Sequence, residues 1–266
     1  SMTVAEARSY IEKTPEGMYT LLDVRQEAEY AREHIPGATL VPLSELADSF
    51  ERLDEEMPVI VYCAMGGRSR VAAQLLAGRG FSQVYNLQGG IKAWNGHKAV
   101  GPREFHLNFI TKDENPEQMI LLAYHMESAV QEFYRELKDR TADEALAAAF
   151  ADLAAYEEEH KQRVVAISGE LGLLDEKNYI ENGTMHSDII EGGFEKDTFF
   201  SDNGPHLTTL AGVLDVAMML ETQSLDLYLR LADEVTRNTA REFLLGMARE
   251  EKQHLSQLAA MLEKTA

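Results

Sequence analysis

The sequence predicts two domains of different fold class. Residues 1–100 are expected to form an α/β domain with a parallel sheet and flanking helices, residues 101–114 a linker, and residues 115–266 an all-α four-helix bundle with a long crossover. Short apolar runs alternate with amphipathic segments before residue 100, whereas long segments of 3.6-residue periodicity follow residue 115. A length of 266 residues also matches two domains of ordinary size.

Three short strands are expected in the first domain, at 19–24, 58–63 and 84–87. Each is a β-branched or apolar run bounded by turn residues. Amphipathic segments fall between them, and this alternation is typical of a parallel sheet. The composition changes between Gly96 and Gly101, where two glycines, Pro102 and mixed polar residues predict the start of the linker.

Four helices are expected in the second domain, at about 116–138, 142–169, 206–235 and 239–264. Thr141 with Glu144 and Thr239 with Glu242 have the spacing of capping boxes, which predicts tight turns before the second and fourth helices. The segment 170–205 is too long for a hairpin turn. It suits a crossover connection along the bundle.

Composition limits the setting and the partners of this protein. One cysteine excludes an intrachain disulfide, the N-terminal residues do not resemble a secretory leader, and no apolar stretch reaches the roughly 18 residues needed to span a bilayer. We therefore expect a cytoplasmic protein with no membrane partner. The formal net charge is −20, with most of the excess acid beyond residue 100. Such a field repels polyanions, so no nucleic acid partner is expected.

The lone cysteine stands at the end of an expected strand, before a loop that leads into a helix. A single cysteine at such a place is usually a small buried hydrophobe. Here Gly66 and Gly67 allow backbone N–H groups to turn inward, and the helix N-terminus adds positive potential. Arg68 adds a fixed charge and a fork of donors. The loop therefore indicates a site that stabilises the thiolate of Cys63, or an anion attached to its sulfur.

Four ordered motifs make residues 1–100 resemble the rhodanese (sulfurtransferase) family. They are Leu22-Asp23-Val24-Arg25, His34-Ile35-Pro36-Gly37-Ala38, the loop Cys63-Ala64-Met65-Gly66-Gly67-Arg68-Ser69, and Gly89-Gly90-Ile91-Lys92-Ala93-Trp94. The resemblance implies that Cys63 takes a sulfane sulfur from a donor such as thiosulfate and passes it to a nucleophilic acceptor such as a thiol. A cysteine phosphatase is the rival class, but its loop is one residue longer, and Ser69 stands where its arginine is expected.

The same resemblance implies a role for each residue of this site. Cys63 is the nucleophile, and Arg68 binds an anionic donor. Backbone amides of the loop cradle the outer sulfur, and they belong to Ala64, Met65, Gly66, Gly67 and Ser69. Asp23 and Arg25 brace the site rather than take part in the chemistry.

A repeated pattern of acids and histidines stands out in the second domain. Glu-x-x-His occurs twice, at 157–160 and at 251–254, and residues three apart project from one face of a helix. Another acid lies 30 residues before each motif, at Glu127 and at Glu221, so the whole set repeats with one offset of 94 residues. Each motif alone has an ordinary interpretation as surface charge. The repeated set instead indicates residues that act together at one site.

These acids and histidines fall inside apolar stripes rather than on polar faces. On the second expected helix, Glu157 and His160 share a face with Phe150, Leu153 and Val164. Burial of four carboxylates without partners is prohibitively costly, so bound divalent cations are the simplest compensation. Four Glu and two His that converge in a bundle form the ligand pattern of carboxylate-bridged di-iron or di-manganese sites.

Residues 115–266 accordingly resemble the ferritin-like superfamily, above all rubrerythrin-type and bacterioferritin-type domains. The resemblance implies two iron ions, or manganese, that react with peroxide or dioxygen. The implied ligands are Glu127, Glu157, His160, Glu221, Glu251 and His254. Ser224 stands where rubrerythrins add an acid, and one cysteine cannot supply a rubredoxin-type iron site, so electrons must come from elsewhere. A homodimer is expected from the family.

Together the two resemblances predict a sulfurtransferase, acting through a Cys63 persulfide, coupled to a di-iron oxidoreductase that uses peroxide or dioxygen. In the alternative, the first domain is a non-catalytic module that senses sulfur species or anions, and the bundle binds or stores iron. Negligible turnover with several donors, despite ready alkylation of Cys63, favours the sensing alternative. A large shell on a sizing column favours storage.

Overall fold

The computed structural model describes residues 1–105, 116–172 and 189–264. The chain divides into two compact units, Ser1–Phe105 and His106–Ala266. Most of the expected linker (101–114) and part of the expected crossover (170–205) lie outside the described residues. Within the described ranges, no helix combines the length and the apolar character that crossing a bilayer requires.

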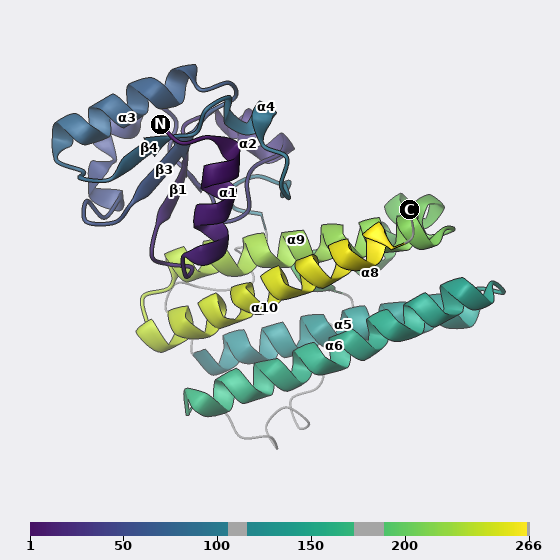
Figure 1. Ribbon diagram of the computed structural model, residues 1–266. Helices are drawn as coiled ribbons and strands as arrows, with labels where there is room; N and C mark the ends of the chain where they lie inside the picture. Colours follow the sequence, from purple (N-terminus) through teal and green to yellow (C-terminus); the bar gives the residue numbers. More distant parts are fainter. Residues whose placement is uncertain (106–115, 173–188, 265–266) are drawn as a thin grey trace. The chain divides into compact units, whose positions relative to one another are not determined.

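Four parallel strands form the sheet of the first unit (Figure 1). They are β1 (Thr20–Asp23), β2 (Thr39–Leu40), β3 (Val59–Tyr62) and β4 (Val84–Asn86), in the spatial order β2-β1-β3-β4. All three pairings are parallel, which confirms the predicted α/β class. The sequence did not predict β2, because two residues are too few to show a strand periodicity.

Helices cover both faces of this sheet, and two short 3₁₀ turns follow β2. The elements are α1 (Val4–Lys13), α2 (Glu27–Arg32), η1 (Leu46–Asp48), η2 (Phe50–Arg52), α3 (Gly67–Arg79) and α4 (Gly90–Ala93). Leu21 and Ile60 point to one face and pack with residues of α1, α2 and α4. Leu22 and Val61 point to the other face and pack with α3. Burial on both faces explains why the strands read as continuous apolar runs.

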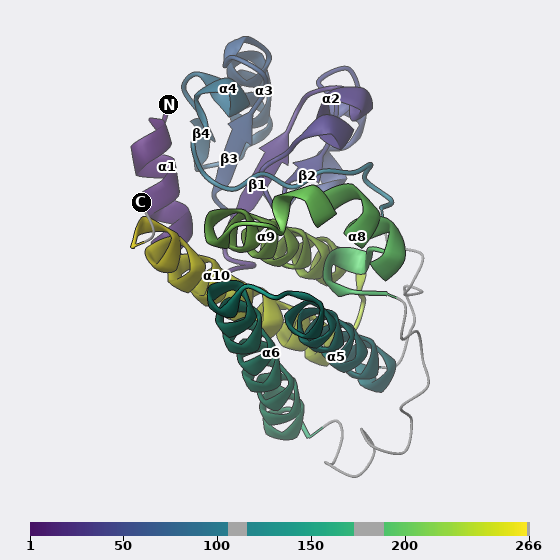
Figure 2. The same ribbon diagram turned by 90° about the vertical axis from the view of Figure 1, so that its right-hand side faces the viewer.

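Four long helices form the second unit, which confirms the predicted bundle. They are α5 (Pro116–Arg140), α6 (Glu144–Glu170), α9 (Leu210–Glu234) and α10 (Asn238–Glu263). Helix α5 lies beside α6, and α9 lies beside α10, so the bundle consists of two hairpins (Figures 1 and 2). The described part of their connection contains η4 (Glu191–Gly193), α8 (Lys196–Asn203) and η5 (Gly204–His206).

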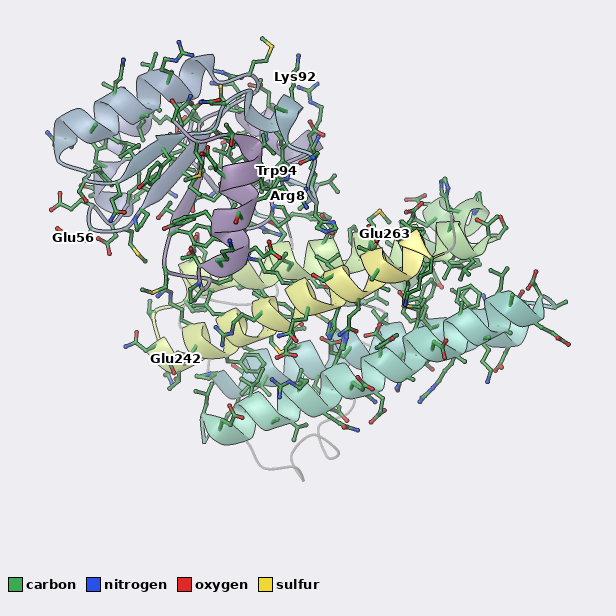
Figure 3. The ribbon with its side chains drawn as sticks, in the orientation of Figure 1. Arg8, Glu56, Lys92, Trp94, Glu242 and Glu263 are labelled. Carbon is green, nitrogen blue, oxygen red and sulfur yellow. The ribbon has the colours of Figure 1, made fainter. Side chains whose placement is uncertain are left out.

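Two apolar cores fill the two halves of the bundle. One contains Ile120 and Phe243, and the other contains Phe150 and Leu258. Along α10, Phe243 and Leu258 lie toward opposite ends, which Glu242 and Glu263 mark in Figure 3. The middle of each helix therefore passes from one core to the other, and the predicted metal ligands belong to this middle level.

The helix ends differ from the predicted capping boxes. Asp143, not Thr141, caps α6, because its carboxylate accepts hydrogen bonds from the amides of the first turn at 2.8 and 3.1 Å. Helix α10 begins after Arg237 without a side-chain cap, so Thr239 lies inside the helix. Helix α9 begins after Thr209, later than the predicted residue 206, because a 3₁₀ turn occupies 204–206.

Candidate functional site

The candidate sulfur site is built where β3 ends. Cys63 follows β3 directly, and its side chain is only 2% exposed. Gly66 precedes α3 with a φ of +97°, a conformation that glycine adopts without strain. Gly90 allows α4 to approach the loop, since a Cβ there would lie 2.2 Å from the carbonyl oxygen of Cys63. The amide of Ile91 donates to that same carbonyl at 2.9 Å. Both glycine motifs thus position the cysteine.

The Cys63 sulfur is surrounded by hydrogen-bond donors. The Gly66 amide lies 3.1 Å from Sγ, and the Ser69 hydroxyl lies 3.4 Å from it. Burial raises the pKa of the Cys63 thiol, but hydrogen bonds from Ser69 and from the amides of Met65 and Gly66 outweigh burial and lower the pKa overall. A lowered pKa increases the fraction of thiolate, which is the nucleophilic form.

Not every residue of the predicted cradle contacts the sulfur in the same way. Met65, Gly66 and Ser69 supply the hydrogen bonds to Sγ. Ala64 contributes through its carbonyl, which accepts a hydrogen bond from the Lys92 amide at 3.1 Å. Gly67 is the first residue of α3. Part of the loop backbone therefore surrounds the sulfur, and part stabilises the conformation of the loop itself.

Arg68 has a partner that the sequence analysis missed. Its Nη1 and Nη2 atoms donate to the two oxygens of Glu29 on α2, at 2.6 and 2.7 Å. The hydrogen bonds from Arg68 hold the pKa of Glu29 at about 2. Glu29 and Cys63 both raise the pKa of Arg68, so the guanidinium interacts with the sulfur as well as with the carboxylate. The spacing of Gln26 and Glu29 at the start of α2 was the one local signal for this glutamate.

Asp23 and Arg25 form a buried ion pair at the end of β1. The Nη2 atom of Arg25 lies 2.6 Å from Asp23 Oδ2 and also donates to the carbonyl oxygen of Glu33 at 2.6 Å. Asp23 is in register with Tyr62, the residue before Cys63. Because both side chains are 3% exposed or less, the pair braces the strand ends beside the cysteine.

The six acids and histidines predicted as metal ligands converge inside the bundle. Each long helix contributes: α5 supplies Glu127, α6 supplies Glu157 and His160, α9 supplies Glu221, and α10 supplies Glu251 and His254. Ligand atoms of the first three lie within 4.8 Å of one another, and so do those of His160 with the last three. Five of the six side chains are buried, and His254 is 13% exposed.

Contacts within this cluster are close. His160 Nδ1 lies 3.0 Å from Glu127 Oε2 and 3.2 Å from Glu157 Oε2. His254 Nδ1 lies 3.6 Å from Glu251 Oε2 and 3.8 Å from Glu221 Oε2. The rings of His160 and His254 are stacked with centroids 3.5 Å apart. Side chains from all four long helices thus bring the two halves of the repeated pattern together.

The charges of the cluster fit bound cations. Buried polar atoms without a hydrogen-bond partner among the described residues include Glu157 Oε2, His160 Nε2, Glu221 Oε2 and both oxygens of Glu251. Burial raises the pKa of Glu157 to about 8. Burial and the neighbouring Glu221 raise the pKa of Glu251 well above its ordinary value, whereas the close approach of Glu251 and His254 outweighs burial and lowers the pKa of Glu221 to about 2. Carboxylates this close coexist by sharing protons or cations.

A small cavity reaches this cluster. Its volume is about 10 Å³, which leaves room for about one water-sized molecule. Besides four of the predicted ligands, its walls consist of Leu153, Tyr156, Gln257, Leu258 and Met261. On the α5 side, the Tyr228 hydroxyl lies 3.5 Å from Glu127 Oε1. The sequence pattern pointed to neither Tyr156 nor Gln257, because no motif marks a cavity wall.

The fold and the cysteine loop define a sulfurtransferase-type α/β domain, and the bundle defines a helical domain with a carboxylate–histidine cluster. Comparisons with known proteins name both. The model of the rhodanese-like domain matches residues 3–97, and the rubrerythrin model matches residues 87–168, which include Glu127, Glu157 and His160. Glu221, Glu251 and His254 lie beyond the second match.

Relatives of known name cover the first domain. A thiosulfate sulfurtransferase GlpE of Coxiella burnetii is 40% identical over 77 residues, which are 29% of this chain and 72% of the relative. The uncharacterized protein YqhL of Bacillus subtilis is 42% identical over 76 residues, 29% of this chain and 60% of YqhL. A solved rhodanese-like domain protein from Staphylococcus aureus has a TM-score of 0.35 at 25% identity, covering 37% of this chain and 95% of that one. This chain belongs to the rhodanese-like family, with a rubrerythrin-type domain in the same polypeptide.

Proposed function

We propose that the first domain is a sulfurtransferase that carries sulfane sulfur as a persulfide on Cys63. The observation that carries this proposal is the ring of donors around Sγ, with the Gly66 amide at 3.1 Å and the Ser69 hydroxyl at 3.4 Å. These donors stabilise the thiolate before the reaction and the outer sulfur anion after it. The name of the GlpE relative supports thiosulfate as one donor.

The transfer needs no cofactor in the first domain. The Cys63 thiolate attacks the sulfane sulfur of the donor, so that a bond forms between Sγ and this sulfur. With thiosulfate, the donor's S–S bond breaks and sulfite leaves with the electron pair. An acceptor thiolate then attacks the outer sulfur, takes it away as its own persulfide, and regenerates the Cys63 thiolate.

Mass spectrometry of the full chain tests this proposal. Incubation with thiosulfate is expected to add one sulfur atom to the parent protein and none to Cys63→Ser, and subsequent addition of a thiol is expected to remove it. Steady-state release of sulfite measures turnover. Absence of the adduct and of turnover with several donors, in protein whose Cys63 still alkylates readily, refutes the transfer and leaves the sensing alternative.

We further propose that the bundle holds two iron ions, with manganese as the alternative metal. Glu127, Glu157 and His160 would hold one ion, and Glu221, Glu251 and His254 the other, because these are the two sequence-related halves of the cluster. Bound iron would supply one-electron redox chemistry toward peroxide or dioxygen. The support is the set of buried ligand atoms that have no hydrogen-bond partner among the described residues.

The chain's own residues set the conditions at that centre. The cavity of about 10 Å³ has room for about one water-sized molecule, so it favours small substrates over larger organic compounds. Leu153, Leu258 and Met261 make its wall largely apolar, which excludes bulk water. Tyr228 lies 3.5 Å from Glu127 and orients this carboxylate. Gln131, whose amide donates to the Ala154 carbonyl at 3.0 Å, ties α5 to α6 close to the ligands.

Metal content tests the second proposal. Elemental analysis of protein purified without chelator is expected to find about two metal ions per chain, and little in a Glu157→Ala/Glu251→Ala variant. Peroxide consumption is then compared in the two proteins. Little metal after reconstitution with Fe(II) and Mn(II) contradicts the oxidoreductase and leaves a sulfurtransferase with a helical assembly module.

Coupling of the two chemistries, the cytoplasmic setting and the homodimer complete the proposal. The presence of both domains in one chain supports coupling, and the single free cysteine supports a reducing, cytoplasmic setting. The homodimer is supported only by the resemblance of the bundle to rubrerythrin-type domains. Peroxide consumption by metal-loaded protein is expected to change when a sulfane-sulfur donor is added, and this change is expected to vanish in Cys63→Ser. Identical donor effects in both proteins contradict coupling, and a sizing column checks the dimer.

A further inference from the structure

Glu29 contacts the arginine of the candidate active-site loop from a separate element. Its carboxylate oxygens accept hydrogen bonds from Arg68 Nη1 and Nη2 at 2.6 and 2.7 Å, which is the bidentate geometry of a strong charge-assisted pair. Glu29 belongs to α2 and lies 39 residues before Arg68 in the chain. The pair is therefore a product of the fold and not of the loop itself.

The carboxylate is fixed in place before any donor arrives. The Gln26 amide donates to Glu29 Oε2 at 3.2 Å, as part of the capping box that begins α2. The side chains of Arg68 and Glu29 are 34% and 24% exposed, so the pair lies at a rim that a small donor can reach. A sulfur donor that binds the Arg68 guanidinium must therefore share it with the fixed carboxylate of Glu29.

The charges near Cys63 therefore do not favour a dianion. Glu29 balances the charge of Arg68, and the reacting thiolate adds a negative charge. Arg25 also acts on Glu29, but its guanidinium is paired with Asp23 at 2.6 Å. Arg70 on α3 and Lys92 on α4, which Figure 3 labels, are further cations; both side chains are exposed, so solvent and salt screen them. Met65, at 67% exposure, adds apolar surface in the loop.

We propose that Glu29 determines the class of sulfur donor: it disfavours donors with two negative charges, such as thiosulfate, and favours thiol persulfides that are uncharged or singly charged. This inference rests on the proposed sulfurtransferase function of Cys63. In the favoured step the Cys63 thiolate attacks the outer sulfur of R–S–SH. The bond from Sγ to that sulfur forms, the donor's S–S bond breaks, and RS⁻ leaves with the electron pair. The proton of the donor stays on the sulfur now bound to Cys63.

Single-turnover persulfidation of Cys63, followed by mass spectrometry of the quenched full chain, tests the proposal. The second-order rate constants are measured with thiosulfate and with the persulfide of 2-mercaptoethanol, which carries at most one negative charge. Glu29→Gln is expected to raise the ratio of the thiosulfate constant to the persulfide constant on the order of tenfold, because one unit charge disappears beside a dianion.

Two further variants separate charge from structure. Glu27→Gln removes an exposed charge from the same helix and is expected to leave the ratio within about twofold of the parent. Glu29→Asp keeps the charge and is expected to keep the ratio near the parent's, whereas a merely structural role makes it behave like Glu29→Gln. An unchanged ratio in Glu29→Gln, with both donors reacting, overturns this inference alone. Absence of Cys63 persulfide from either donor in the parent refutes the sulfurtransferase itself.

Discussion

Replacement of Glu157 by glutamine tests whether the buried carboxylates exist to hold cations. Glu157 is 2% exposed, and burial raises its pKa from 4.5 to about 8 in the metal-free protein. As pH rises from 4.5 to 8, the unfolded chain releases this proton while the folded chain keeps it, so the metal-free protein loses stability over this window. At about 1.4 kcal/mol per pKa unit, the loss reaches about 3 kcal/mol at pH 7.

Glutamine has nearly the same shape and carries no charge to desolvate. Metal-free Glu157→Gln is therefore expected to equal the parent near pH 4.5 and to exceed its free energy of unfolding by up to about 3 kcal/mol at pH 7. Loss of the contact to His160 Nδ1, which lies 3.2 Å from Glu157 Oε2, reduces this gain. With saturating Mn(II) the order reverses, because only the parent retains the full ligand set and hence the full stabilisation by the metal.

Urea titrations of chelator-treated protein, at several pH values between 4.5 and 8, measure the effect. Far-UV circular dichroism follows mainly the helical bundle. Trp94, the single tryptophan, reports by fluorescence on the first unit and is expected to give the same transition in both proteins. Glu159→Gln removes an exposed charge from α6 and is the matched control, with an expected change within about 0.5 kcal/mol.

The opposite sign refutes this reasoning. If metal-free Glu157→Gln is less stable than the parent at every pH, then the carboxylate is a structural partner in the folded bundle. If Mn(II) stabilises the parent and the variant equally, then Glu157 is not a ligand.

Three further predictions concern the first domain. The rate of Cys63 alkylation is expected to rise with pH around a midpoint below the ordinary thiol pKa of 9.0, because hydrogen bonds lower the pKa of this thiol. Ser69→Ala is expected to raise this midpoint, and a midpoint above 9.0 in the parent contradicts the assignment. Gly90→Ala is expected to destabilise the domain by more than about 3 kcal/mol, since the alanine Cβ would lie 2.2 Å from the Cys63 carbonyl oxygen. A thermal melt that matches the parent's contradicts the close approach of residue 90 to this carbonyl. Asp23→Asn leaves the buried Arg25 charge without its charged partner and is expected to lower the free energy of unfolding by about 3–5 kcal/mol in a urea titration. A change below about 1 kcal/mol shows that the hydrogen bond to the Glu33 carbonyl is enough to hold Arg25.

Periodicity predicted most of this fold because the signals are local. The long helices α5, α6, α9 and α10 each repeat an apolar face over several turns, and β1 and β3 are buried on both faces, so their apolar runs are continuous. The misses are equally local in cause. Strand β2 is only two residues long, too short to show a periodicity. Asp143, not Thr141, is the N-cap of α6, because it lies directly before the first turn of the helix.

The candidate metal residues were predictable because each helix carries part of a repeated pattern. Glu157 and His160 share a helix face by their spacing alone, and the repeat supplied the other members of the set. The cavity wall at Tyr156 and Gln257 left no such trace, since residues of two helices meet there only after the bundle packs.

The sequence by itself determined which residues carry chemistry: the cysteine before a glycine-rich turn, and acids placed where apolar residues belong. Only the tertiary structure decided what surrounds them. Glu29 reaches Arg68 across 39 residues, and His160 meets Glu127 across 33, because the packing of separate elements places these side chains within hydrogen-bond distance. Spacing along one element is encoded locally, whereas a contact between elements depends on the summed packing of the whole core.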